Sequence, residues 1–130
     1  MVEIIRPEQV DAVWSDIEQY FIKANDRHKV SLGRVTPEEI LRRAKESDIL
    51  ILKIQDKGAA AFEIIEETFH CISLGGTNMT DWIEEFVPDC ELIAKELGMK
   101  EITLAGRKGW GKVLSKFNYE HSMTVYGRKL

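Results

Sequence analysis

The feature that most constrains the fold is a change of hydrophobic period near the middle of the chain. Apolar side chains in residues 8–25 recur at helical spacing, which predicts an amphipathic helix. Thr36, Pro37 and Glu39 then have the chemistry of a helix start: a hydroxyl cap, a proline in the first turn and a capping-box glutamate. From Ile49 onward the period becomes that of β-strands. The pattern predicts a domain that mixes helices with strands.

The predicted strands form a short first segment and a consecutive central group. Residues 2–5 read as a strand that ends before Pro7, which cannot donate a backbone hydrogen bond. Residues 56–58, Asp-Lys-Gly, have the chemistry of a hairpin loop, and Glu-Glu-Thr at residues 66–68 turns the chain again. Strands joined by such short turns pair antiparallel. The sequence therefore predicts a three-stranded meander at residues 49–54, 59–65 and 69–74.

The last 56 residues alternate helices and strands. Residues 75–79 break the strand pattern, and Thr80 can cap a helix whose apolar face reaches Leu97, with Gly98 as its stop. Pro88 lies inside this helix, so either it kinks the helix or the continuous part begins there. A strand, a short helix and a closing strand are predicted next, at residues 100–105, 106–117 and 122–126. Because a helix connects it to the meander, the first of these strands is expected to lie parallel to its neighbour.

This element order predicts the fold class. A chain of 130 residues without repeats or linkers fits a single domain, residues 1–130. The fold is expected to be α/β of the α+β type: a mixed, mostly antiparallel sheet flanked by helices on both faces.

Composition and cysteine usage exclude several other classes of protein. No apolar run approaches the roughly 20 residues of a membrane span, and the first residues do not resemble a secretory leader. We therefore expect a cytoplasmic protein with no membrane partner. Cys71 and Cys90 lie apart in apolar surroundings and read as reduced core thiols. With three histidines and no CxxC, no metal-ligand spacing is present, so no metal cofactor is expected.

Charge is distributed unevenly along the chain, whose net charge is −4. Residues 1–97 hold 11 Lys and Arg against 20 Asp and Glu, whereas residues 98–130 hold seven against two. A basic end on an acidic body favours an anionic ligand, although a solvated surface of uneven charge explains it equally. The basic residues are few and not interleaved with aromatic residues, so no nucleic-acid partner is expected.

The C-terminal third resembles a known family. A strand at residues 102–104, a short amphipathic helix at residues 110–117 and Asn-Tyr at residues 118–119 are similar to the end of the GCN5-related N-acetyltransferases (GNATs). The whole element order also looks like the GNAT fold. The run at residues 106–110, together with Leu114, resembles the small GNAT-like proteins that tailed phages encode. The resemblance implies a single GNAT-like acyl-CoA N-acyltransferase domain.

The resemblance also implies a cofactor site. In the family, acetyl-CoA lies in a V-shaped opening between the fourth and fifth strands. Its pantetheine arm hydrogen-bonds the fourth strand, here residues 69–74, and its pyrophosphate rests on a glycine-rich loop, here residues 75–80. Two basic residues after the next strand would meet the 3′-phosphate or an acidic partner. The implied cofactor contacts are Ile72, Leu74, Gly75, Gly76, Thr77, Asn78, Thr80, Arg107 and Lys108.

Three positions depart from the family pattern. The loop at residues 75–80 has two adjacent glycines and no Lys or Arg, and Asp81 and Glu84 would repel a pyrophosphate. The glycines are explained equally by a turn that needs a positive φ. Leu114 stands where many members have the tyrosine that protonates the departing CoA thiolate, and Arg107 stands where an asparagine often contacts the cofactor.

Catalytic candidates follow from the same resemblance. The family commonly uses Glu, Asp or His as a general base through a water, and the candidates here are His70 on the fourth strand and Glu63 on the third. With Leu114 unable to act as an acid, the proton for the thiolate would come from Tyr119, Tyr126 or bulk water.

Two functions from different classes remain open at this point. The first is an acetyl-CoA-dependent N-acetyltransferase that acts on an amine substrate. The second is a catalytically inactive GNAT-like domain that serves as a phage structural or host-interaction protein, in the host cytoplasm or the virion, with a protein partner. The acceptor and the oligomeric state are not determined by the sequence, and a homodimer is one option.

Overall fold

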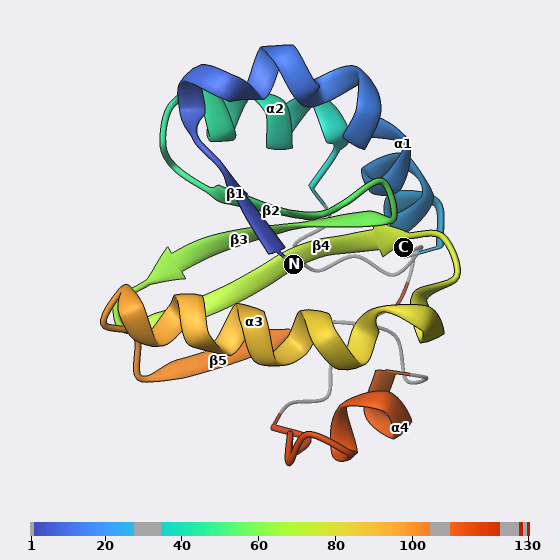
Figure 1. The fold of residues 1–130 in the computed structure, drawn as a ribbon, viewed down its shortest axis with the longest axis vertical. Helices are drawn as coiled ribbons and strands as arrows, with labels where there is room; N and C mark the ends of the chain where they lie inside the picture. The colour runs from blue at the N-terminus through green and yellow to red at the C-terminus, as the bar shows by residue number, and fades with distance from the viewer. Residues whose placement is uncertain (1, 28–34, 105–109, 123–127, 129) are drawn as a thin grey trace.

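In the computed structural model, residues 2–27, 35–104, 110–122, 128 and 130 are described. One five-stranded sheet in the order β1-β2-β3-β4-β5 forms the centre of the fold (Figure 1). The neighbouring pairs are antiparallel except for β4 and β5, which are parallel. The strands are Val2–Ile5 (β1), Leu50–Ile54 (β2), Gly58–Ile65 (β3), Thr68–Gly76 (β4) and Glu101–Leu104 (β5). The predicted mixed, mostly antiparallel sheet is confirmed.

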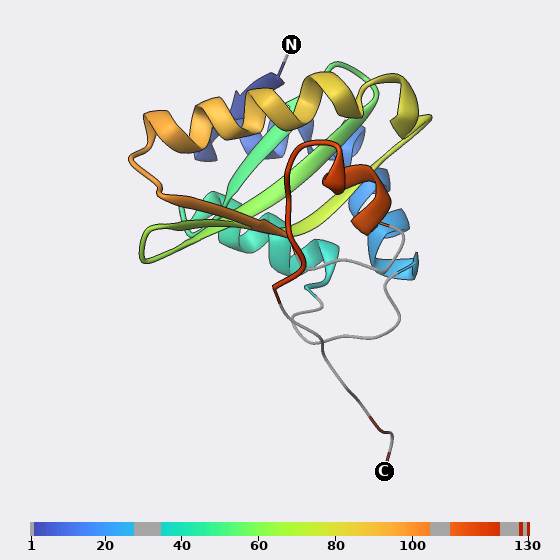
Figure 2. The ribbon, with the colours of Figure 1, turned by 90° about the horizontal axis from the view of Figure 1, so that it is seen from below.

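Helices cover both faces of the sheet, as the sequence predicts. Helices α1 and α2 lie on one face and α3 and α4 on the other, and Figure 2 shows the latter pair in front of the sheet. The helices are Val10–Arg27 (α1), Pro37–Lys45 (α2), Ile83–Glu96 (α3) and Trp110–Ser115 (α4). Short 3₁₀ helices at Pro7–Gln9 and Met79–Asp81 precede α1 and α3. No helix in the described part of the chain is long and apolar enough to span a membrane.

Two hydrophobic cores result, one on each face. Alternation along β3 divides its residues between them, because successive side chains of a strand point to opposite faces. Ala59 and Ala61 are buried under α1 and α2, whereas Ala60 and Phe62 are buried under α3 and α4. The Phe62 ring stacks on Phe69 of β4 with centroids 4.2 Å apart.

Local helix signals in the sequence hold in the structure. The Thr36 hydroxyl accepts a hydrogen bond from the Glu39 backbone N–H at 3.2 Å, which caps α2 as predicted. Gly98 has φ +79 and ends α3, and its N–H donates to the Lys95 carbonyl while the Met99 N–H donates to the Ala94 carbonyl. These two bonds form a Schellman motif. Pro88 lies within α3, which begins at Ile83.

Other local predictions were wrong. Leu97 was expected on the apolar face of α3, but the helix ends at Glu96 and the Leu97 side chain is 44% exposed. Thr80 does not cap α3, because it lies inside the 3₁₀ helix Met79–Asp81 and the helix starts later. The closing strand at 122–126 lies, apart from Ser122, outside the described residues.

Gly75 and Gly76 were expected in a loop, but they are the last two residues of β4, paired with Ala59 and Gly58. Both glycines permit close packing. A Cβ on Gly75 would lie 2.0 Å from the Tyr20 carbonyl oxygen, and one on Gly76 would lie 2.5 Å from the Trp82 ring. Neither glycine is among the described residues with positive φ, so the turn explanation is also wrong.

We predict that Gly75→Ala lowers the free energy of unfolding by roughly 1–3 kcal/mol or more, because its methyl group would displace the backbone of α1. Urea denaturation measures the change. Gly111→Ala is the control, since nothing lies within 4 Å of its added methyl, and it should be neutral or stabilising by up to about 1 kcal/mol. Equal effects of the two substitutions would contradict the role assigned to Gly75.

Both cysteines are buried and free, as predicted. Burial raises the pKa of the Cys71 thiol to about 12 and also raises the pKa of Cys90. A thiol whose folded-state pKa is raised contributes stability that is fully present below its unfolded pKa of about 8.5 and is lost as the pH rises further.

We therefore predict that the free energy of unfolding falls between about pH 9 and pH 12, by up to about 1.4 kcal/mol per pH unit and thiol. Denaturant unfolding across this range measures the slope. The double variant Cys71→Ala/Cys90→Ala should lose this part of the pH dependence even if it is less stable at neutral pH. An unchanged slope in the variant would show that other groups cause it.

Candidate functional site

Strands β4 and β5 pair along all of β5 but only along the first part of β4. They pair over four residues each, from Thr68 opposite Glu101 to Cys71 opposite Leu104. Strand β4 continues beyond this point to Gly76, still paired with β3. Among the described residues, the far edge of residues 72–76 therefore has no strand partner.

A β-bulge in β4 lies immediately after its last pair with β5. The β3–β4 register passes from Phe62 opposite Cys71 to Ala61 opposite Ser73, which leaves Ile72 as the extra residue. A bulge increases local twist and interrupts pairing. It also changes the alternation of side chains, since Cys71 and Leu74 both pack in the α3/α4 core while Ile72 packs on the other face.

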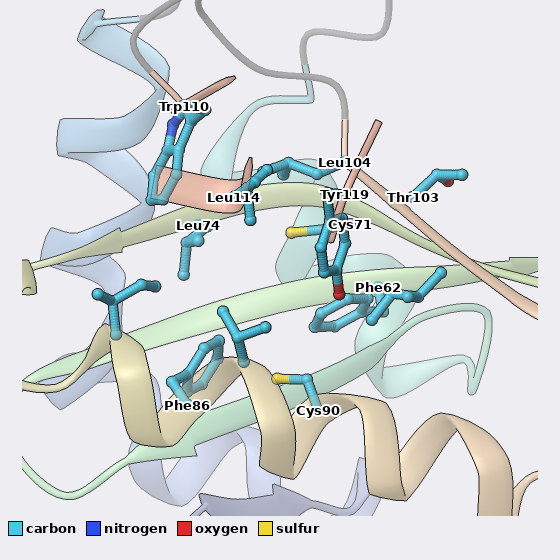
Figure 3. Close-up of a pocket in the computed structure, with 13 residues that line it drawn as sticks. Phe62, Cys71, Leu74, Phe86, Cys90, Thr103, Leu104, Trp110, Leu114 and Tyr119 are labelled. Carbon is cyan, nitrogen blue, oxygen red and sulfur yellow. The ribbon is translucent and has the colours of Figure 1, made fainter. Parts of the chain in front are cut away.

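A small cavity of about 40 Å³ lies beside the bulge, on the α3/α4 side of the sheet. It has room for a few water molecules at roughly 10–15 Å³ each. Its lining is almost entirely apolar and comes from β3, β4, β5, α3, α4 and the segment after α4. Figure 3 shows the labelled lining side chains, with Thr103 turned away from the rest. The labelled residues are Phe62, Cys71, Leu74, Phe86, Cys90, Thr103, Leu104, Trp110, Leu114 and Tyr119.

Tyr119 projects into this cavity, beside Leu114 (Figure 3). Burial raises the pKa of Tyr119, and a hydrogen bond from its hydroxyl to the Glu91 carboxylate on α3 raises it further. The raised pKa keeps the phenol protonated and makes it a weaker acid than an ordinary tyrosine. Tyr126, the other phenol considered, lies outside the described residues.

A row of polar side chains crosses the opposite face of the sheet, on the α1/α2 side. His70 on β4 lies between Glu63 on β3 and Thr103 on β5 in the strand registers. Thr103 Oγ1 is 2.6 Å from His70 Nδ1. Glu63 accepts a hydrogen bond at 2.8 Å from Arg43 of α2, which also contacts Asp48.

The two predicted base candidates, Glu63 and His70, thus lie side by side, but they differ in their bonding partners. Glu63 is held in a half-buried ion pair with Arg43, whereas His70 keeps one ring nitrogen without a partner among the described residues. Neither Arg43 nor Thr103 was identified from the sequence. The signal for Thr103 was available only in retrospect, as the residue directly opposite His70 once β5 is aligned parallel to β4.

The segment after β4 folds back on itself. The Thr77 N–H donates to the Lys57 carbonyl at 2.8 Å, and Trp82 Nε1 donates to the Thr77 carbonyl at 2.8 Å. Asn78 has left-handed backbone angles, and Thr80 follows within the 3₁₀ helix. This segment brings no cation toward a phosphate. Arg107 and Lys108, the basic residues proposed for that role, lie outside the described residues.

The residues present therefore fit one part of acetyl-CoA better than the other. The unpaired β4 edge suits the amide-bearing pantetheine arm, whereas the adjoining apolar cavity of about 40 Å³ is too small to enclose it. Tyr20 and Trp82 occupy the space beside the glycines at the end of β4, so this space cannot hold a pyrophosphate. No group of three or more His, Cys, Asp or Glu side chains in the described part of the chain is placed to hold a metal ion.

The chain matches no protein-family model and no curated protein sequence at a significant level. Solved structures do match over their full length. A ribosomal-protein-alanine N-acetyltransferase from Brucella melitensis biovar Abortus 2308 has TM-score 0.66 and 7% identity, covering 100% of this chain and 99% of that one. An aminoglycoside acetyltransferase from an uncultured soil metagenomic sample has TM-score 0.68, 13% identity and coverage of 100% and 97%.

A third match is a predicted acetyltransferase from Clostridium acetobutylicum, solved with acetyl-CoA. It has TM-score 0.65 and 11% identity, and covers 99% of this chain and 95% of that one. At these identities the likeness concerns the fold alone. This likeness is consistent with the order of the strands, with the parallel β4–β5 pair and with the helices on both faces of the sheet. The chain therefore has the fold of the GCN5-related N-acetyltransferases.

Proposed function

We propose that this protein is an N-acetyltransferase that transfers the acetyl group of acetyl-CoA to an amine. The observation that carries the proposal is that β4 continues through the Ile72 bulge to Gly76, beyond its last pair with β5. It leaves a free strand edge between an apolar cavity on one face and a polar row containing His70 on the other. The similar acetyltransferase structure solved with acetyl-CoA supports this choice of donor.

The free edge of β4 holds the acyl donor in this proposal. Backbone groups of Ile72 and Leu74 pair with the pantetheine amides, as a neighbouring strand would. A backbone N–H at the same edge stabilises the negative charge that develops on the thioester oxygen. Acetyl-CoA supplies an activated acetyl group with a thiolate leaving group. Arg107 and Lys108 are the proposed contacts for its phosphates.

His70 is the general base that we propose. It removes a proton from the acceptor ammonium, directly or through a water, so that the neutral amine can attack the thioester carbon. We assign Glu63 to holding Arg43, because its carboxylate is already bonded to that guanidinium. Tyr119 is the proposed proton donor to the thiolate because its phenol lines the cavity beside the β4 edge, and the thiolate must displace its bond to Glu91. The acceptor amine is not indicated by the fold.

Calorimetric titration with acetyl-CoA tests donor binding. We predict binding at millimolar or lower concentration, with amide shift changes in NMR at residues 72–76. Arg107→Ala/Lys108→Ala should weaken acetyl-CoA but leave acetyl-pantetheine unaffected, because only the former carries phosphates. The control is Lys112→Ala/Lys116→Ala, which also removes two positive charges, from α4 and from the residue after it. Absence of heat from the wild-type protein at millimolar acetyl-CoA would exclude the proposed function.

Turnover with an amine panel tests the base. The panel includes alanine-containing peptides of ribosomal proteins and aminoglycosides, because two similar structures are a ribosomal-protein-alanine N-acetyltransferase and an aminoglycoside acetyltransferase. His70→Ala should lower kcat by about 10²-fold or more, as expected for loss of a general base. Glu63→Gln should reduce stability but change kcat less than threefold. If Glu63→Gln instead abolishes turnover while His70→Ala does not, Glu63 is the base. CoA release, followed with a thiol reagent, measures each rate.

A further inference from the structure

The contact between His70 and Thr103 has a geometry that constrains the histidine ring. The two residues lie directly opposite each other in the parallel β4–β5 ladder, one pair before its last pair, Cys71 opposite Leu104. The distance of 2.6 Å between His70 Nδ1 and Thr103 Oγ1 is at the short end for a hydrogen bond. Both side chains are half-buried, so the bond is partly shielded from competing water.

This bond uses one of the two ring nitrogens of His70. In a neutral imidazole one nitrogen carries the proton and the other carries the lone pair, and a hydroxyl can accept from the first or donate to the second. Nδ1 is bonded to Thr103, whereas Nε2 has no partner among the described residues. If the Thr103 hydroxyl accepts the proton of Nδ1, the lone pair lies on Nε2.

No other described side chain competes for this position. Glu63, the cross-strand neighbour of His70 on β3, could orient the ring from the other side, but its carboxylate is bonded to Arg43. Thr103 is held in turn by the β5 backbone, which pairs with β4 on both sides of it. The ring orientation therefore depends on the Thr103 hydroxyl.

We propose that Thr103 is a positioning residue that holds His70 in the Nδ1–H tautomer, so that Nε2 takes the proton from the acceptor amine. This inference rests on the proposed function of His70. An N–H bond of the acceptor ammonium breaks and the proton binds Nε2, giving an imidazolium that keeps its Nδ1–H bond to Thr103. The freed lone pair of the amine then attacks the thioester carbon, the thiolate leaves with the electron pair of the C–S bond, and the second proton lost by the acylated nitrogen goes to the thiolate.

Two variants separate the hydroxyl from the shape of the side chain. Thr103→Val replaces the hydroxyl with a methyl group and keeps the β-branched form suited to a strand. Thr103→Ser keeps the hydroxyl and removes the methyl group. Thr68→Val is the matched control, because it makes the same change at the start of β4, where the threonine side chain makes no hydrogen bond to the described part of the chain.

The ring nitrogens of His70 report the tautomer directly. In ¹⁵N-labelled protein, long-range ¹H–¹⁵N NMR spectra should show a protonated Nδ1 and a lone-pair Nε2 in the wild type. Thr103→Val should move both shifts toward the average of the two tautomers, and Thr103→Ser and Thr68→Val should keep the wild-type values. A wild-type ring protonated on Nε2, or unchanged shifts in Thr103→Val, would overturn the proposal.

Kinetics provide the second readout. Thr103→Val should lower kcat by about tenfold, a part of what loss of the base itself costs, with the Kd for acetyl-CoA changed less than twofold. Thr103→Ser should restore kcat to within about threefold. The proposed function fails separately, when the wild-type protein neither binds acetyl-CoA nor acetylates any amine of the panel. The NMR spectra of His70 still decide the role of Thr103 in that case.

Discussion

The β-bulge at Ile72 is the constraint on which the site depends. It places one unpaired residue in β4 immediately after the last pair with β5, Cys71 opposite Leu104. A bulge adds local twist and changes the direction of the strand that carries it. The same register shift turns Leu74 toward the α3/α4 core. The free edge, the apolar cavity and the polar row on the other face all meet at this point.

Packing on the far half of β4 holds that half in place. Gly75 lets the backbone of α1 approach so closely that no side chain fits between them. The hydroxyl of Tyr20, from the same part of α1, donates to the Asp56 carbonyl at 2.6 Å and so joins α1 to the β2–β3 turn. On the other face, the Trp82 ring covers Gly58 and Gly76. The glycine pair therefore contributes to the site by fixing the strand, and not by cradling a phosphate.

Fold and chemistry are carried by different parts of the molecule. The sheet and its two cores agree with acetyltransferase structures over the whole chain, at identities too low to carry function. The function proposed here depends on His70, its partner Thr103 and the open edge of β4, which are properties of this chain. The loop after β4 is closed by the bond from Trp82 to Thr77 and is followed by acidic residues in the first turn of α3.

Periodicity and capping chemistry determined the elements by themselves: the meander, the Thr36 cap, the Gly98 stop and a sheet with helices on both faces. These are local signals, because a cap or an alternating strand acts within a few residues. Tertiary structure decided what local signals cannot carry. The bulge at Ile72 depends on pairing with β3. Gly75 is required by Tyr20, 55 positions earlier in the chain, and Gly76 by Trp82, six positions later. His70 meets Thr103 only because a helix crossover brings β5 beside β4 in parallel register.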